Sequence, residues 1–500
     1  MITRRRSAGQ SGNLQSRLGF CTVWLKLRLT PSRRFLLFLH GNMWYNDLMD
    51  IHIPEFVKHC IHMLEENGHR AYIVGGCLRD SLRGTPPADW DICTTALPEE
   101  MQAALAGKVR TLPTGLKHGT LTLLGERMSV EATTMRRDGP YTDHRRPDTV
   151  SFTLALEEDL ARRDFTVNAM AFSPREGLCD PFGGQKDLAG QILRCVGDPL
   201  RRFEEDALRI LRLFRFAAAL GFLPQPETLA GAGAKKNLLG AVSAERISGE
   251  LSKLIMGQKA EAALGLAAEC GVLGEIIPAL RPAIGFDQRS PYHNRTVDAH
   301  SFAALAFAPP SHDLRLALLL HDIGKPATAT FDENGQGHYK GHAGVGAEIA
   351  AGVLKELRYP AKTAAYVQKL IAFHSKKIPA QPEVLRRFMG EHGVAFAREL
   401  LVLKEADNRA KSDICAPRLE HCRRVKKMLE EIVAAGDCLT LADLAVKGKD
   451  LAQAGIPPGP QTGAALRRLL ELVWQHPEKN DRQILLGEMA IDNGQWTMDN

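Results

Sequence analysis

The stretch "GGCLRDSLRGTPPADWDICTT", residues 75–95, contains the pattern on which the predicted fold depends. It follows the apolar run "AYIV" with two glycines, continues as a short helical pattern, and ends in "DWDICT", where polar and apolar residues alternate. A period of two predicts a β-strand that places Asp89 and Asp91 on one face and sends Trp90 and Ile92 into a core. The order strand, helix, strand predicts mixed α and β structure here.

The paired aspartates suggest chemistry. Two carboxylates side by side can bind two divalent ions, ~3.5–4 Å apart, that stabilise the attacking and leaving oxygens of a phosphoryl transfer. Alternation in "RMSVEATT" turns Glu131 away from Met128 and Val130, which makes Glu131 a candidate third carboxylate. The plain alternative is a polar turn, because D-x-D pairs are also common there.

The two glycines fit the same chemistry. Gly75 and Gly76 stand between a predicted strand and a predicted helix, where backbone N–H groups can hold phosphates, and Arg79 lies one turn further on. A simple turn explains the glycines equally well when they are taken alone. Together with the aspartates, they predict a triphosphate bound beside two metal ions.

The whole chain has the composition of an ordinary globular protein. Its 500 residues are 44% hydrophobic and 24% charged, enough for several domains, and no apolar run approaches the ~20 residues that span a bilayer. The ten cysteines are scattered without C-x-x-C pairs, which predicts reduced thiols in a cytoplasmic protein. We therefore expect no membrane contact.

The formal net charge of +6 depends on the first residues of the chain. Residues 1–46 contain eight Lys or Arg and no Asp or Glu. Of the 64 basic residues, 56 therefore lie in the rest of the chain, two fewer than the 58 acidic residues there. A basic arm for nucleic acid or a targeting peptide is one interpretation. The favoured interpretation is that residues 1–48 are a disordered extension or precede the true start, near Met43 or Met49.

Strand and helix patterns divide the chain. The segments "AYIVGG", "DWDICT", "GTLTLLG", "RMSVEATT" and "TVNAMAF" have strand character, whereas after "DPFGGQKDLAG" Leu, Ala, Arg and Glu recur at helical spacing to the end. The predicted fold class is therefore α+β: a head with a small mixed sheet, followed by an essentially all-helical remainder.

A series of motifs resembles a known family. "GGCLRD", "ADWDICTT", "MRRDGPYTDHRRPDTV", "ARRDFTVNAMAF", "RRFEEDALRILRLFRFAAALGF" and "SAERISGELSKLI" look like the motifs of the class II tRNA nucleotidyltransferases, the CCA-adding enzymes, and of the related poly(A) polymerases. They occur in the family's order between Ile53 and Leu254. The resemblance implies a polymerase-β-like head and template-independent addition of C, C and A to a tRNA 3′ end from CTP and ATP, with release of pyrophosphate.

The resemblance also implies roles for residues of the head. Asp89 and Asp91 would be Mg²⁺ ligands, and Gly76 and Arg79 would contact the incoming nucleotide. In "RRDF", Arg163 would approach the nucleotide, while Asp164, Phe165 and Asn168 would shape the site.

The motif "EEDALR" can be argued from its spacing. On one continuous helix, Glu205 and Asp206 lie four and three residues before Arg209, so both acids could orient its guanidinium. A carboxylate accepts from the exocyclic amine of cytosine or adenine, and an arginine donates to the neighbouring acceptor, whereas uracil and guanine have the opposite polarity. The resemblance assigns this reading role to Asp206 and Arg209, with Arg212 and Arg215 in support. A solvated helical ion pair is the alternative that spacing alone favours.

A second constellation lies between residues 296 and 412. "TVDAHS", "LLLHDIGKP", "YKGHAGVG", "AFHSKK" and "LKEADNRA" resemble the HD metal-dependent phosphohydrolases, and their candidate ligands are His300, His321, Asp322, His342, His374 and Asp407. Imidazoles with carboxylates suit a transition metal of the Mn, Ni or Co type. The resemblance suggests a 2′,3′-cyclic phosphate or 2′-phosphate as substrate. A degenerate helical scaffold remains the alternative.

These interpretations divide the chain into five parts. Residues 49–176 form the nucleotidyltransferase head, 177–295 a helical neck for nucleotide and tRNA, 296–412 the HD domain, and 413–500 a helical tail for tRNA. A poly(A) polymerase, an enzyme that adds only C or only A, and an HD phosphohydrolase with a non-catalytic RNA-binding head remain competing interpretations.

Overall fold

The computed structural model describes residues 51–139 and 149–492. The predicted basic extension, residues 1–48, and the middle of "MRRDGPYTDHRRPDTV" therefore lie outside the described residues. Among the described helices, none is long and apolar enough to cross a membrane.

The head is built on a seven-stranded mixed sheet. Its strands, in spatial order, are β3 (Arg110–Gly115), β4 (Thr120–Leu124), β5 (Ser129–Thr134), β2 (Trp90–Thr94), β1 (Ala71–Val74), β8 (Ala171–Ser173) and β9 (Gly177–Cys179). The strands β2 and β5 pair in parallel, and the other neighbours pair antiparallel. Two strands of three residues each lie outside this sheet and pair with each other: β6 (Arg136–Asp138) and β7 (Val150–Phe152). The small mixed sheet predicted from the sequence is confirmed.

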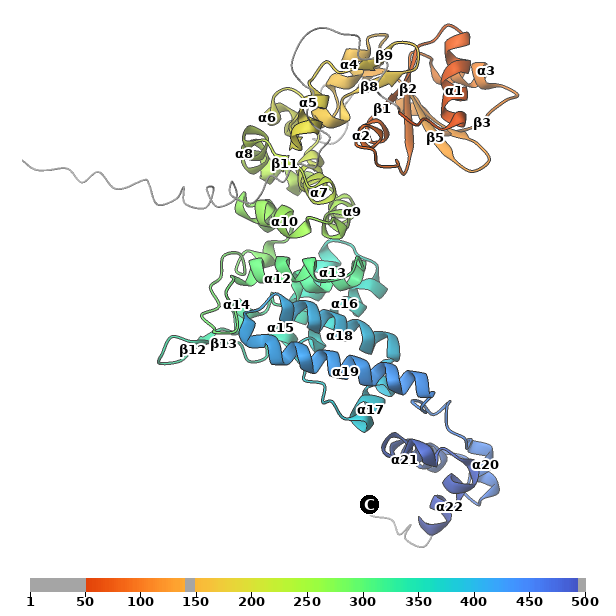
Figure 1. Ribbon diagram of the computed structural model, residues 1–500, viewed down its shortest axis with the longest axis vertical. Coiled ribbons are helices and arrows are strands. Elements are labelled where there is room, and N and C mark those ends of the chain that lie inside the picture. The colour runs from red at the N-terminus through yellow and green to blue at the C-terminus, as the bar shows by residue number, and fades with distance from the viewer. Residues whose placement is uncertain (1–50, 140–148, 493–500) are drawn as a thin grey trace, which may run out of the picture. The chain divides into compact units, whose positions relative to one another are not determined.

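Helices pack on this sheet because its strands alternate as expected. Trp90 and Ile92 of β2 are buried in one apolar cluster with residues of α1 (Glu55–Glu66) and α3 (Pro98–Leu105), which lie side by side in Figure 1. The helix α2 (Gly76–Leu82) follows β1 directly and adds Cys77 and Leu78 to the same cluster. Burial of Trp90 and Ile92 leaves Asp89 and Asp91 facing the other way.

One strand prediction is wrong in part. In "TVNAMAF", Thr166–Asn168 form the 3₁₀ turn η4, and only Ala171–Ser173 join the sheet as β8. Side-chain hydrogen bonds explain the difference: Asp164 accepts from the backbone N–H of Phe165 and from the side-chain amide of Asn168. Such local bonds compete with the pairing of a strand.

The rest of the described chain is helical apart from two short strand pairs. Before residue 296 the helices are α4 (Leu156–Ala161), α5 (Gly184–Gly190), α6 (Pro199–Glu205), α7 (Leu208–Leu220), α8 (Pro226–Lys235), α9 (Ala244–Met256), α10 (Ala260–Glu269) and α11 (Val272–Ile276). The small pairs are β10 (Ile192–Leu193) with β11 (Leu223–Pro224), and β12 (Thr330–Phe331) with β13 (Gly337–His338). The helix α7 packs against α9 and α10.

The helices after residue 296 continue the same apolar core. They are α12 (Val297–Ala306), α13 (His312–Leu320), α14 (Lys325–Thr328), α15 (His342–Glu356), α16 (Ala361–Phe373), α17 (Pro382–His392), α18 (Val394–Arg409) and α19 (Ala416–Ala435). One buried cluster runs from Phe203 through Leu316 to Ile432. The final helices, α20 (Gly448–Gln453), α21 (Pro460–Gln475) and α22 (Arg482–Asp492), have a core of their own around Leu469 and Trp474.

A glycine in the turn after α13 provides a test of this packing. A Cβ atom at Gly324 would lie 2.3 Å from the carbonyl oxygen of His342 and 2.5 Å from the nitrogen of Gly346. We expect Gly324→Ala to lower the free energy of unfolding by about 1–3 kcal/mol, because the backbone of α15 must move away. The measurement is the denaturant midpoint followed by circular dichroism.

The matched control is Gly352→Ala in α15. Gly352 is exposed and a Cβ there meets no atom within 4 Å. Alanine is the better helix former by about 1 kcal/mol, so the midpoint should stay or rise. Equal losses for the two variants would contradict the packing described for Gly324.

Candidate functional sites

The glycine turn after β1 brings the backbone close to two charged side chains. Gly75 has φ of 75°, and a Cβ there would lie 3.0 Å from Nη1 of Arg163 and 3.5 Å from Oδ2 of Asp91. Both the positive φ and the close approach require glycine. Arg79 is buried in α2, where it donates to Asp80 and, from Nη1, to Oδ1 of Asn168 at 2.7 Å.

The predicted carboxylates lie at the start of β2 and beside it. Asp89 is exposed immediately before the strand, and Asp91 is half-buried within it. Glu131 of β5 is the direct partner of Asp91 in the parallel register. Burial raises the pKa of Asp91, Arg163 opposes this, and the charges of Glu131 and Asp89 raise it further. Three acids this close favour a bound cation.

The motif "RRDF" supplies an arginine and an aspartate with fixed partners. Arg163 donates to Oδ2 of Asp159 at 3.3 Å. Asp164 accepts from the amide of Asn168 at 3.0 Å and from Nε of Arg212 at 2.7 Å. Burial would raise the pKa of Asp164, but the Arg212 guanidinium and Asn168 outweigh it and hold that pKa well below its usual range.

The prediction for "EEDALR" is half right. Glu205 accepts from Nη1 of Arg209 at 2.7 Å, as expected. The helix does not continue, however: α6 ends at Glu205, Asp206 is extended with φ −136° and ψ 105°, and α7 begins at Leu208. Because of this break, the Asp206 carboxylate does not pair with Arg209 and instead contacts Nη2 of Arg246 at 3.1 Å.

The arginines of α7 share one face of the helix. Arg209 also donates from Nη2 to the carbonyl oxygen of Arg162 at 2.8 Å, and Arg215 lies 3.0 Å from Glu250 of α9. The guanidinium of Arg215 stacks 4.1 Å from the centroid of the buried Phe216 ring, which Arg79 and Arg212 also approach. These contacts leave each arginine oriented by the protein before any ligand arrives.

A cavity of about 510 Å³ collects most of the predicted residues. Its lining includes Gly75, Gly76, Arg79, Asp89, Asp91, Arg163, Asp164, Asn168, Asp206, Arg209, Arg212 and Arg215. Glu205 lies behind Arg209 and outside the lining, and Glu131 lines a smaller neighbouring cavity of about 180 Å³ with Asp91. Arginines above carboxylates suit a ligand with phosphates and a divalent cation.

Sequence reasoning missed eight residues of this cavity. They are Cys77, Asp80, Pro87, Ala88, Arg162, Leu208, Phe216 and Arg246. Arg246 is the most informative, because it comes from "SAERISGELSKLI", 40 residues after its partner Asp206. Nothing in the local pattern connects the two residues, and only the packing of α9 on α7 does so.

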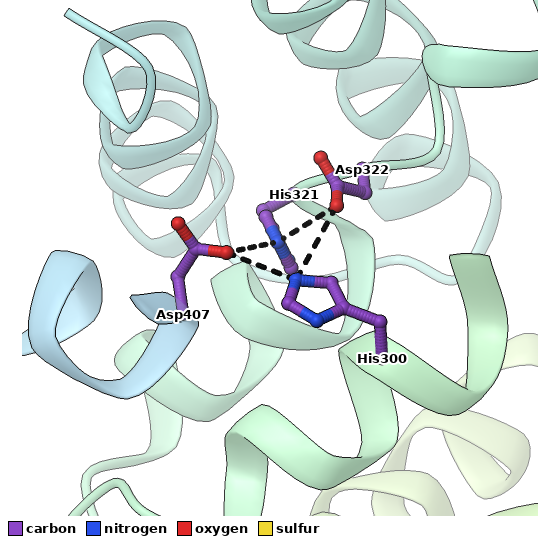
Figure 2. Close-up of side chains that lie close together, drawn as sticks. All are labelled: His300, His321, Asp322 and Asp407. Carbon is purple, nitrogen blue, oxygen red and sulfur yellow. Dashed lines mark hydrogen bonds and ion pairs between the residues drawn. The ribbon is translucent and has the colours of Figure 1, made fainter. Parts of the chain in front are cut away.

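The second constellation forms a buried cluster in which all six predicted ligands meet. His300, His321, Asp322 and Asp407 come from α12, the turn after α13, and α18, and they point toward one another in Figure 2. Nε2 of His300 lies 2.9 Å from Oδ1 of Asp407 and 3.5 Å from Oδ2 of Asp322. Their ligand atoms all lie within 4.8 Å of one another, which is the spacing of a metal site.

A second group shares Asp322. Its other oxygen, Oδ1, lies 3.5 Å from Nε2 of His342 and 3.6 Å from Nε2 of His374. The two Nε2 atoms are 3.1 Å apart. Asp322 therefore stands between two groups of ligands, as a carboxylate that bridges two metal ions would.

Backbone carbonyls fix the histidine tautomers. The Nδ1 atoms of His321, His342 and His374 lie 2.6–2.8 Å from the carbonyl oxygens of Leu318, Tyr339 and Ile371. A ring that donates from Nδ1 has a lone pair on Nε2, so all three rings offer acceptors to the centre. Nε2 of His321 lies 3.2 Å from Oδ2 of Asp322 and 3.4 Å from Oδ1 of Asp407, so this buried nitrogen points at two carboxylate oxygens, and a divalent cation could be held between the three groups.

The charges around the cluster also favour a cation. Burial lowers the pKa of His374 to about 4, so this ring stays neutral and can act as a metal ligand through Nε2. Burial would lower the pKa of His321 as well, but the neighbouring Asp322 and Asp407 raise it to about 9. A site that raises a buried imidazole pKa in this way stabilises positive charge, whether a proton or a metal ion carries it.

The cluster opens into a cavity of about 920 Å³ with a basic rim. Sequence reasoning missed Lys325 and Lys411, whose ammonium groups lie 2.7 Å from Asp322 and 2.5 Å from Asp407. The exposed side chains of Lys340, Lys377 and Arg424 line the cavity, and no hydrogen bond or ion pair within the described residues holds them. Free cations at the rim suit a phosphorylated ligand.

Comparison with known families matches three segments of the chain. Residues 71–194 match the poly A polymerase head domain, and residues 221–284 match the family described as the probable RNA and SrmB-binding site of polymerase A. Residues 299–411 match the HD domain.

Similar proteins extend over most of the chain. A CCA-adding enzyme of Levilactobacillus brevis is 33% identical over 446 residues, 88% of this chain and 99% of that protein. A CCA-adding enzyme of Geobacillus thermodenitrificans is 41% identical over 271 residues, and that match spans 54% of this chain and 63% of that enzyme. The crystal structure of the Bacillus stearothermophilus CCA-adding enzyme in complex with CTP has a TM-score of 0.65 and 28% identity, covering 88% of this chain and 97% of that one. This chain belongs to the CCA-adding enzyme family.

Proposed function

We propose that this protein adds C, C and A to the 3′ end of a tRNA from CTP and ATP. The observation that carries the proposal is one cavity that is lined both by the carboxylates Asp89 and Asp91 and by Asp206 and Arg209, the two residues that we call the reading pair. The relatives named as CCA-adding enzymes support it, as does the similar enzyme whose structure contains CTP.

The chemistry requires a cation held by the carboxylates. A nucleotidyltransferase head and an HD domain both imply divalent metal ions. In the head, Asp89 and Asp91 would hold Mg²⁺, with Glu131 beside them, and bound Mg²⁺ supplies a lowered pKa for the attacking hydroxyl and charge stabilisation for the leaving oxygens. The tRNA 3′ oxygen then bonds to the α-phosphorus, and the bond from that phosphorus to the pyrophosphate oxygen breaks.

The chain's own residues orient the triphosphate. The close turn at Gly75 and Gly76 lets a phosphate approach the backbone, while Arg79 and Arg163 approach from the side. Asp80 and Asn168 hold Arg79, so the guanidinium needs little reorganisation on binding.

Nucleotide choice would come from the reading pair. The Asp206 carboxylate accepts from the exocyclic amine of cytosine or adenine, and Arg209, held by Glu205 and a backbone carbonyl, donates to the acceptor beside it. Uracil and guanine would leave these groups without partners, a penalty of about 1–3 kcal/mol per group. Arg212 and Arg215 would support the reading pair with further contacts to the nucleotide.

A second activity is proposed for the HD domain. The six ligands described above would hold a pair of transition-metal ions of the Mn, Ni or Co type, which supply an activated water and charge stabilisation. The free rim cations Lys340, Lys377 and Arg424 would bind a phosphorylated substrate, such as a 2′,3′-cyclic phosphate or a 2′-phosphate. Water adds to phosphorus, and the ester oxygen leaves with a proton.

The division into a head (49–176), neck (177–295), HD domain (296–412) and tail (413–500) remains our proposal. The matched families support it, although the head match runs on to residue 194. The neck and tail would bind tRNA. The nine described cysteines are unpaired, which supports our assignment to the reducing cytoplasm.

Separate substitutions distinguish the two active sites. Asp91→Asn should lower nucleotide addition to a tRNA that lacks its 3′ end by at least about 10³-fold, because one metal ligand is lost. His321→Ala should leave addition unchanged. Products are read on a sequencing gel, and addition that continues as a long adenosine ladder would instead indicate a poly(A) polymerase, whereas addition of only C or only A would indicate a partial enzyme.

If His321→Ala lost addition and Asp91→Asn retained it, the head would be the non-catalytic module and the HD domain the enzyme. Circular dichroism of both variants would show that each is folded. The parent protein supplies the reference products.

Asp206→Ala tests the choice of nucleotide. We expect it to raise incorporation of UTP or GTP relative to CTP or ATP by about tenfold or more, because the carboxylate that rejects the opposite polarity is absent. The Mg²⁺ concentration needed for half-maximal rate should stay the same. Misincorporation equal to that of the parent would rule out the reading role.

Metal binding at the HD cluster can be measured without any substrate. Mn²⁺, Ni²⁺ or Co²⁺ should raise the melting temperature of metal-stripped protein, since a ligand at 100 times its Kd stabilises by about 2.7 kcal/mol. Asp322→Asn should abolish the rise, because Asp322 belongs to both groups. His62→Ala, an exposed histidine of α1, is the control and should retain it. An equal rise in Asp322→Asn would contradict the site.

A further inference from the structure

We infer that Arg246 is a positioning residue for nucleotide selection, which it performs by fixing the carboxylate of Asp206. The inference rests on the proposed function. Nη2 of Arg246 lies 3.1 Å from Oδ2 and 3.3 Å from Oδ1 of Asp206, although the two residues are 40 positions apart. The contact joins α9 to the junction of α6 and α7.

Asp206 needs such a partner because its own helix does not hold it. With φ −136° and ψ 105° it lies between two helices, outside the regular backbone of both. Its Oδ1 accepts from the backbone N–H of Leu208 at 3.1 Å, and this bond alone leaves the carboxylate free to turn. The Arg246 guanidinium fixes the plane of the carboxylate, while lone pairs remain for a base amine.

A second pair from the same face of α9 supports the inference. Glu250 follows Arg246 by four residues, one helical turn, and lies 3.0 Å from Arg215. Arg246 and Glu250 therefore hold Asp206, just before α7, and Arg215, within α7. Both residues have side chains that are 25% exposed or less, so water screens these pairs little.

Arg246 also has an unused donor. Its Nη1 is buried and has no hydrogen-bond partner among the described residues, and Arg246 lines the nucleotide cavity. A buried N–H without a partner is unfavourable. A phosphate oxygen, which CTP and UTP share, would satisfy this group without discriminating between bases, so the pair lies at the ligand while selection still acts through Asp206.

The test compares nucleotide selection in matched variants. The ratio of kcat/KM for CTP to that for UTP is measured on a tRNA that lacks its CCA end. Arg246→Gln should lower this ratio about tenfold, with a smaller loss in kcat for CTP, and Arg246→Lys should recover part of it. Glu245→Gln is the control, because it weakens the exposed neighbouring pair with Arg358, makes no contact with Asp206, and should leave the ratio unchanged.

A double variant separates positioning from stability. In Asp206→Ala protein, adding Arg246→Gln should lower the ratio no further, since Arg246 acts through Asp206. A second, independent tenfold loss there, or an unchanged ratio in Arg246→Gln, would overturn the inference. If Arg246→Gln does not fold by circular dichroism, the same comparison made with Arg246→Lys decides.

Failure of the proposed function has a different signature. Parent protein that extends no tRNA would remove that function, and the inference would then be judged by equilibrium dialysis of CTP against UTP. Loss of the preference for CTP in Arg246→Gln would still support it. An equal preference in the parent and the variant would overturn it.

Discussion

Each arginine that α7 presents to the nucleotide cavity is paired with a carboxylate from another element. Arg209 pairs with Glu205 of α6, Arg212 with Asp164 of the head, and Arg215 with Glu250 of α9. A guanidinium keeps its charge in proteins, so burial is tolerated only with a partner, and loss of one partner of a buried pair costs about 3–5 kcal/mol. These three pairs therefore tie the head, α6 and α9 to one helix and orient the guanidinium groups that line the cavity.

In the HD cluster the groups in the centre are acceptors instead of cations, and they too are oriented by neighbouring groups of the protein. Its centre gathers acceptors, and the surrounding groups fix their direction: carbonyl oxygens orient His321, His342 and His374, while Lys325 and Lys411 balance Asp322 and Asp407. The cavity of the head presents oriented arginines that can bind an anion, whereas the HD cavity presents oriented acceptor atoms that can bind a cation. Both arrangements lower the reorganisation that ligand binding requires.

The sequence predicts what short spacing determines and misses what distant packing determines. Alternation in "DWDICT" correctly predicts that Trp90 and Ile92 are buried. The six HD ligands predicted from the motifs do come together, in two groups that share Asp322. The break at Asp206 was missed because "EEDALRILRLFR" has a helical pattern throughout, and no local signal marks the extended residue. The partnership with Arg246 depends on how α9 packs against α7, which no local pattern encodes.

The helix α9 links the two sites physically. Its Arg246 and Glu250 pair with Asp206 and Arg215, which line the cavity of the head. Its C-terminal carbonyls are capped from the HD side, where Arg315 of α13 donates to the carbonyl oxygens of Ile255 at 2.8 Å and Gly257 at 3.2 Å. Carbonyls at a helix end lack partners within the helix, and a cation there is favourable. Ser252 of α9 adds a hydrogen bond to His312 at 2.9 Å. The HD helices therefore fix the C-terminal part of α9, the helix that carries Arg246, through contacts that do not involve the metal-ligand cluster.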